Sequence, residues 1–484
     1  MVNIINGKGV LRLLLVSVAL ATLASCKKDD TSGSLWFERP AVYMEDRGRA
    51  TVRYAGSEID PASVWVSSSP DGWDVVVDHG AMTLTVTAPE ASDEEADMSG
   101  TVIIRANSTG GGAAASASLF AGVVGSVDLS DRMANSFLVS RKETHYTFDA
   151  TRAGDGAPLA TASVAVVWQS PSSLVQYLAF ENGKASFYVG ARSDDAARIK
   201  EGNALVGAYD AGGNLIGSWH IWAADYDPEA AEGSVVLNGF RMMSRNLGAR
   251  ASSYASTDDI LSSFGLFYQW GRKEPFIGPA SYDSAGSKSA SMYDGSGRSV
   301  YLTTAASDPA TGTMDYALTH PLVFITAPKD ADWLDAAASD GGQRWSADRK
   351  TSCDPCPYGW RVAPAAAYAG LSIADDLAGD NAALAELYRD RYAWTLTDGQ
   401  AESLFFGAGR RSYRNGSLQN YYDDSLPVRS AALEMQPWVG YYWTAEAAEA
   451  FCFWFLLDDV AASGVRSRTM GAANGMQVRC VAVE

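Results

Sequence analysis

The sequence is poor in histidine, the side chain that most often acts as a general base or a transition-metal ligand. The four histidines, His79, His145, His220 and His320, are isolated, and none lies at metal-ligand spacing from a cysteine. The G-x-S-x-G and H-E-x-x-H patterns of common hydrolases are also missing. These absences argue against a zinc site and against the familiar hydrolytic centres. No cofactor is expected.

Basic residues are in deficit as well. The chain has 38 Lys and Arg against 57 Asp and Glu, which gives a formal charge of -19. Such a balance argues against nucleic acid as a partner and against adhesion to anionic lipid by charge alone. With 484 residues the chain is too long for one typical core, so several domains are expected.

The only long apolar run, residues 13–23, lies near the N-terminus behind Lys8 and Arg12. A basic start, a short apolar core and small residues after it are typical of a secretory signal, and the run is too short for a membrane span. Its end, "LASC", resembles the bacterial lipobox, in which the cysteine is acylated and becomes the first mature residue. Residues 1–25 are therefore interpreted as a lipoprotein signal peptide and Cys26 as the lipid attachment site.

The segment behind Cys26, "KKDDTSGS", is interpreted as a tether over 26–34. Its Lys28, Asp29 and Asp30 resemble the short signal that sends lipoproteins to the cell surface in Bacteroidetes. The resemblance implies an outer-membrane lipoprotein that is exposed on the surface.

Two all-β units are expected next. In the first, residues 35–124, Met82, Leu84 and Val86 alternate with threonines as in a half-buried strand. Its pattern resembles Ig-like sandwich domains. The second, residues 126–230, contains a hairpin signal at Asn182-Gly183 and another hairpin at Gly212-Gly213.

The remaining segment, 231–484, carries a series of specific motifs. They are "RNLGA", "GLFYQWGRKEPF", "HPLVFITAPKDADWL", "CDPCPYGWRVAPA", "LFFGAGRRSYRNGSL", "GYYWTAEA" and "GMQVRCV". Together they resemble the Fibrobacter succinogenes major paralogous domain, which is similar to the C-type-lectin-like fold. The expected architecture is thus two Ig-like sandwiches followed by an α+β lectin-like domain with two helices. The helix candidates are 364–379, where Pro364 suits a first turn, and 381–392. Trp270, Trp360 and Trp443 lie inside the motifs and are expected in the core.

Four cysteines remain after Cys26, and in an exported chain they can pair in three ways. Cys356 leads into a turn and a strand rather than a helix, which argues against a redox C-x-x-C. In the resembled family the cysteine before P-x-G-W and that in V-R-C recur, which implies a disulfide between Cys356 and Cys480. Cys353 and Cys452 would form the second pair.

Catalytic sets are scarce. The acid pairs at 375–376, 423–424 and 458–459 are adjacent, and adjacent strand positions face opposite ways, unlike the facing carboxylates of a glycosidase. Formylglycine-generating oxidases resemble the same lectin-like fold. However, they use a close cysteine pair near the C-terminal end, which Cys353 and Cys356 do not occupy. The segment "MQPW" lacks the aspartate of calcium-dependent sugar sites.

Aromatic residues in the loop 411–442 are the ligand-binding candidates, because flat rings with polar tips stack on sugars or contact proteins. They are Tyr413, Tyr421, Tyr422 and Trp438. The alternative interpretation is that these rings pack the loop against its own domain.

The sequence therefore predicts a non-catalytic binding protein held on the outer membrane by its lipid anchor. It would act as an adhesin, a fimbria-associated subunit or a glycan-capture lipoprotein, with a glycan or a surface protein as its ligand. The alternatives are an extracellular enzyme acting on glycans or proteins and a purely structural envelope lipoprotein.

Overall fold

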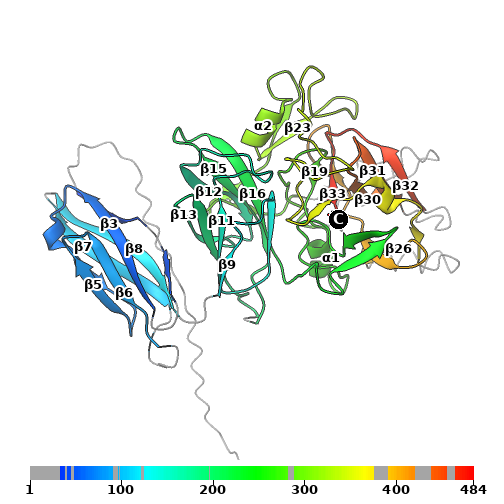
Figure 1. Cartoon of the computed structure of the whole chain (residues 1–484). Helices are drawn as coiled ribbons and strands as arrows, with labels where there is room; N and C mark the ends of the chain where they lie inside the picture. The colour runs from blue at the N-terminus through cyan, green and yellow to red at the C-terminus, as the bar shows by residue number, and fades with distance from the viewer. Residues whose placement is uncertain are drawn as a thin grey trace, which may run out of the picture.

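The computed structural model describes residues 33–483 apart from several internal segments. Those segments are 39–40, 45–47, 91–95, 97–98, 109, 122–124, 196, 282–287, 375–390, 420–437 and 455–463. The predicted signal peptide, Cys26 and nearly all of the tether lie outside the described residues. No helix in the described part is long and apolar enough to cross a bilayer. Strands dominate, and Figure 1 shows three bodies in a row along the chain.

The N-terminal body is a sandwich of two four-stranded sheets around one core. One sheet has the order β1 (Ser34–Phe37), β3 (Arg49–Ser57), β6 (Thr83–Thr87), β5 (Asp74–Asp78). The other has the order β2 (Ala41–Tyr43), β8 (Gly111–Phe120), β7 (Ser99–Ser108), β4 (Trp65–Ser68). Leu84 and Val86 are fully buried in this core and Met82 packs against it, as their alternation predicts.

The middle body is a second sandwich. One sheet has the order β13 (Gln176–Glu181), β14 (Lys184–Val189), β11 (Thr144–Asp149), β9 (Gly125–Asp128). The other begins with β10 (Ser136–Val139), β16 (Leu215–Ala223), β15 (Gly202–Tyr209), β12 (Ser163–Ser170). The β13–β14 hairpin turns at Asn182 and Gly183 with φ angles of 52° and 81°, the double left-handed turn that the Asn-Gly pair predicts.

This second sheet continues past residue 230. Its last two strands are β20 (Met292–Tyr293) and β21 (Ser299–Val300), which lie beyond the 126–230 segment. Gln169 on β12 pairs with Tyr293, and its side-chain amide donates to the carbonyl of Asp294 at 3.1 Å. Trp168 and Trp222 share one core with Trp270. The middle and C-terminal bodies are therefore joined by a common sheet and a common core.

The C-terminal body contains several sheets. The first has the order β17 (Ser234–Leu237), β18 (Phe240–Met243), β34 (Cys480–Ala482), β24 (Trp360–Val362). The largest has the order β29 (Leu418–Gln419), β28 (Arg410–Arg411), β33 (Gly475–Val478), β30 (Trp438–Trp443), β31 (Glu449–Trp454), β32 (Gly464–Thr469), with β19 (Tyr268–Gln269) beside β33. The smaller ones are β22 (Thr303–Ala306) with β23 (Val323–Thr326), and β25 (Ser372–Ile373), β26 (Ala393–Thr397), β27 (Glu402–Phe406). Trp270, Trp360 and Trp443 are each at most 4% exposed, which confirms their predicted core positions.

Two complete helices are described, and both are short and lie outside the predicted helical ranges. They are α1 (Thr257–Ser263) and α2 (Met314–Thr319). The helix predicted over 364–379 is wrong over 364–374, the part that is described, where only a 3-10 turn, Ala365–Tyr368, follows Pro364. Gly370 adopts a left-handed φ of 66°, and the chain then enters β25 because Ile373 pairs with Leu396. The second candidate, 381–392, lies almost wholly outside the described residues.

Candidate binding groove

The described residues contain no group of three His, Cys, Asp or Glu side chains that could hold a metal ion. The acid pairs singled out in the sequence, at 375–376, 423–424 and 458–459, lie outside the described residues.

The predicted aromatic binding residues are not assembled into a site. Tyr413 is only 9% exposed and packs in the main core, and its hydroxyl accepts a hydrogen bond from Nε of Arg414 at 2.9 Å. Its proposed role as an exposed stacking ring is wrong, because the ring packs the loop against its own domain. Tyr421 and Tyr422 lie outside the described residues. Trp438 starts β30, but its side chain is not among those described.

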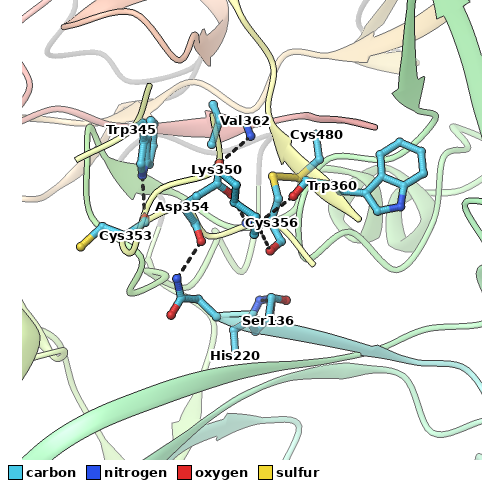
Figure 2. The surroundings of a disulfide bond; sticks show 11 residues. Ser136, His220, Trp345, Lys350, Cys353, Asp354, Cys356, Trp360, Val362 and Cys480 are labelled. Atoms are coloured by element: carbon cyan, nitrogen blue, oxygen red, sulfur yellow. Dashed lines mark hydrogen bonds and ion pairs between the residues drawn. A yellow bond between two sulfur atoms is a disulfide. The ribbon is translucent and has the colours of Figure 1, made fainter. Parts of the chain in front are cut away.

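One of the two predicted disulfides is present. Cys356 and Cys480 are bonded, and the bridge ties the CDPC turn to the last strand, 124 residues further along the chain. Figure 2 shows this bridge beside Trp360, where β24 begins.

The predicted Cys353–Cys452 disulfide is wrong, since both thiols are free and buried. Their surroundings differ. The thiol of Cys353 lies near Glu274, whereas the charged groups around Cys452 are Arg468 and other arginines of the C-terminal sheet. Burial raises the pKa of each thiol to about 12, so both side chains behave as small apolar core residues.

A buried carboxylate organises the turn that carries Cys356. Asp354 is 1% exposed and accepts hydrogen bonds from the backbone N–H groups of Cys356 at 2.9 Å and Val362 at 3.0 Å. The ammonium group of Lys350 lies 2.9 Å from the same carboxylate and donates to the carbonyls of Cys356 and Trp360, both at 2.7 Å. Figure 2 shows these groups converging on the turn. The disulfide and this ion pair together fix the position of residues 357–360.

The turn is held against the middle sandwich by Asn135, which lies just before β10. Its side-chain amide donates to the carbonyl of Ser352 at 2.7 Å and to that of Asp354 at 2.8 Å. Ser136 forms a parallel bridge with Pro357. The C-terminal turn is thus fixed to the start of β10.

His220, on β16, completes this contact. The ring is 1% exposed, and its Nε2 lies 2.9 Å from Oδ1 of Asn203 while its Nδ1 lies 3.1 Å from the hydroxyl of Ser136. The amide of Asn203 donates to Gly248 at 2.9 Å, so Oδ1 is the acceptor and Nε2–H the donor. Nδ1 then accepts from Ser136. His220 is a neutral, fully satisfied strand residue rather than a base.

The burial of His220 predicts acid sensitivity. Burial lowers its pKa to about 3, well below the ordinary value of 6.5. The unfolded chain therefore binds a proton more readily, and stability that is present above about pH 6.5 is lost as the pH falls toward the folded pKa. The contribution corresponds to about 2 kcal/mol between pH 7 and pH 5.

Urea unfolding at pH 7 and at pH 5 measures this loss, with His220→Gln as the control. The variant is expected to be less stable at pH 7 but to lose about 2 kcal/mol less than the wild type on acidification. Equal losses in the two proteins would contradict the assignment.

A groove of about 800 Å³ opens where the middle sandwich meets the C-terminal body. Its size falls in the range of ligand sites in proteins. Four groups of residues line it: 126–132 around the end of β9, 136–141 along β10 with Tyr146, 226–229, and 357–360.

The groove wall at 357–360 presents an exposed aromatic ring. Tyr358 is 58% exposed. The backbone N–H of Val483 donates to the carbonyl of Gly359 at 2.8 Å, which places a second exposed apolar side chain, 46% exposed, beside this wall. Trp360 is buried under the guanidinium group of Arg241, 4.8 Å from its ring centre. An exposed ring on a fixed wall is a suitable anchor for a ligand.

Three consecutive charged residues of the motif "GRKEPF" are buried away from the groove. Lys273 donates to the carbonyl and the hydroxyl of Ser218 on β16, both at 2.7 Å, and its ammonium lies 3.1 Å from Glu274. Arg272 donates to the carbonyls of Ala317 and Val323. Lys273 thus attaches the C-terminal body to the middle sheet, Arg272 bonds within the C-terminal body, and both are structural.

The sequence did not reveal the groove. Its walls come from segments more than 200 residues apart, and only "CDPCPYGW" was recognised as a motif. Within that motif the available signal was the order of residue types: an aspartate, then a cysteine, then an aromatic residue in a turn.

No protein-family model matches the chain, and no curated protein matches it. Solved structures align with parts of it. An I-band fragment of titin, I67–I69, matches at 14% identity over 39% of this chain and 64% of that chain, with a TM-score of 0.14. Human protocadherin-24 EC1-2 matches at 8% identity over 41% and 100%, with a TM-score of 0.15. An endo-fucoidan hydrolase from glycoside hydrolase family 107 matches at 13% identity over 40% and 34%, with a TM-score of 0.16. The chain spans less than two thirds of the titin fragment, and likenesses with TM-scores this low carry no argument about fold or function.

Proposed function

We propose that the chain is a non-catalytic binding protein, anchored to the outer membrane through Cys26 and displayed on the cell surface. The groove between the middle sandwich and the C-terminal body is its ligand site. The observation that carries the proposal is this groove of about 800 Å³, whose wall is a doubly fixed turn with an exposed tyrosine. The C-terminal body is proposed to be a C-type-lectin-like member of the Fibrobacter succinogenes major paralogous family, on the strength of the motifs alone.

Export is supported by independent features of the chain. The leader and the "LASC" sequence indicate transport and acylation. The disulfide between Cys356 and Cys480 is of the kind that persists in oxidising surroundings outside the cytosol.

Of the three carboxylates that line the groove, those of Asp131, Asp227 and Glu229, the last two are tied into local structure. Glu229 is engaged by Arg241, with the closest nitrogen at 2.6 Å from its carboxylate. Asp227 accepts the backbone N–H of Glu229 at 2.9 Å. These two carboxylates therefore serve local structure rather than forming a facing acid and base pair over the groove.

The proposal is tested by measuring ligands of the full-length chain on glycan and peptide arrays. For a ligand found there, Tyr358→Ala is expected to weaken binding at least tenfold, because an anchor ring at the centre of a site contributes about 2 kcal/mol or more. Tyr301→Ala is the matched control, since Tyr301 is 76% exposed and lies away from the groove. If Tyr358→Ala binds as the wild type does while Tyr421→Ala or Trp438→Ala loses the ligand, the site is in the 411–442 loop and the groove is refuted. Silence on both arrays contradicts the function itself.

A further inference from the structure

The β10 strand lies at the edge of its sheet. The order begins with β10, which pairs in parallel with β16 through Ser136–His220, Phe137–Ile221, Leu138–Trp222 and Val139–Ala223. The strand β9 likewise ends the order of the opposite sheet. Residues of both edges line the groove, so it runs between two strands that each have a side without a neighbouring strand in the described part of the chain.

The register shows which backbone groups of β10 are free to pair. The carbonyl of Asn135 accepts from His220 at 2.8 Å, and that of Val139 accepts from Ala224 at 3.1 Å. In a parallel ladder alternate residues face the same neighbour, so the backbone groups of Leu138 point away from β16, toward the groove. Ser136 faces the same way and meets Pro357.

The lining of the groove supports this orientation. Six consecutive residues, 136–141, line it. Side chains of a strand alternate between its two faces, so a wall that touches consecutive residues touches the backbone edge. Phe137 and Val139 confirm this: their side chains are 5% and 1% exposed and belong to the sandwich core, and they therefore reach the groove through their backbone.

Among the residues that the structure describes, only the start of this edge is covered. Pro357 stands beside Ser136 but has no N–H, and its carbonyl accepts from Trp360 at 3.1 Å. The ladder stops there because the N–H of Trp360, which a parallel pairing with Leu138 would use next, donates to Pro357 instead. The backbone of Ser136 is covered in this way, and the backbone groups of the next outward-facing residue, Leu138, are open to pairing with a partner.

We propose that the groove takes an extended peptide segment of a partner protein, which adds as a strand to β10 next to Leu138. This deepens the proposed function, on which it rests, by naming the ligand class. An extended segment supplies main-chain donors and acceptors with the spacing of the open edge, and alternate apolar side chains contact Leu138 and Tyr358. A second copy of this chain pairing edge to edge is the alternative occupant, and loss of self-association in Leu138→Pro would identify it.

The test uses a phage-displayed library of nine-residue peptides selected on the full-length chain in detergent, with a glycan array run in parallel. Selected peptides are expected to alternate apolar and polar residues. Leu138→Pro, which removes the edge N–H, is expected to weaken them at least tenfold, because proline is tolerated at an edge strand but cannot pair. Leu138→Ala, which keeps the N–H, is expected to weaken them less than threefold.

A second readout does not depend on how the proline variant folds. In the wild type, a bound peptide is expected to slow hydrogen exchange of the Leu138 amide at least tenfold. Unchanged exchange, or equal affinity of the Pro and Ala variants, overturns strand addition. Self-association abolished by Leu138→Pro would also overturn it, in favour of a second copy.

The parallel array separates the two proposals. Glycans that bind and are lost in Tyr358→Ala, with no peptide selected, would leave the binding function standing and remove the peptide. If neither the peptide library nor the glycan array yields a ligand, both the binding function and the peptide ligand are refuted.

Discussion

Replacing Cys356 and Cys480 together by alanine is expected to lower the free energy of unfolding by about 5 kcal/mol, the value that the chain-entropy model gives for a loop of this length. The bridge spans 124 residues and joins the turn before β24 to β34. The two bodies that share a core are expected to unfold together, so the loss should appear in the signals of both.

The measurement is urea unfolding of the wild type and of the double variant, each with and without a thiol reductant. The reductant is expected to destabilise the wild type toward the variant and to leave the variant unchanged. Mapping of the unreduced wild type should recover Cys353 and Cys452 as free thiols that label only after unfolding. A reductant that shifts both proteins equally would contradict the assignment of the bridge.

Local features of the fold were predictable because they depend on neighbours in sequence. The Asn182-Gly183 turn and the alternation of Leu84 and Val86 each follow from the conformations of a few adjacent residues. The predicted helix at 364–379 failed for the opposite reason. Pairing of Ile373 with Leu396 is a tertiary contact, and it overrides the helical preference of the alanines.

The cysteines show the same limit. The Cys356–Cys480 pair followed from a family resemblance, whereas Cys353 with Cys452 was assigned because they were the two that remained. Both lie in the same core cluster, but with different charged neighbours. Pairing two cysteines because the others are already assigned uses no information about their distance. A buried free thiol is as stable in a core as a small apolar residue.

The groove could not be predicted because it depends on which strand edges are left open. That β10 ends its sheet follows from the order in which strands assemble, and no spacing within residues 136–141 encodes it. The exposed Tyr358 is likewise set by a turn whose partner Asn135 lies in a distant segment of the chain. Alternation and turn patterns predict single strands and turns, and they do not predict a site that forms between two bodies.

Removing the carboxylate that organises this turn has the second large effect. Asp354→Ala is expected to cost about 4 kcal/mol, because it leaves the mostly buried ammonium of Lys350 without its counter-charge and two backbone N–H groups without an acceptor. Asp354→Asn keeps an acceptor but not the charge, so it should fall between the alanine variant and the wild type. Urea unfolding measures the loss.

The same substitution is also expected to lower the affinity for the groove ligand, because it loosens the wall of the groove. Asp354 fixes residues 357–360, so its alanine variant should bind the groove ligand more weakly while still folded. The Tyr358 side chain is still present in this variant, but its orientation is no longer fixed. Asp348→Ala is the matched control, because Asp348 is an exposed carboxylate in the same loop. Wild-type stability and affinity in Asp354→Ala would show that the disulfide alone holds the wall, and the ion pair would then have no part in positioning the site.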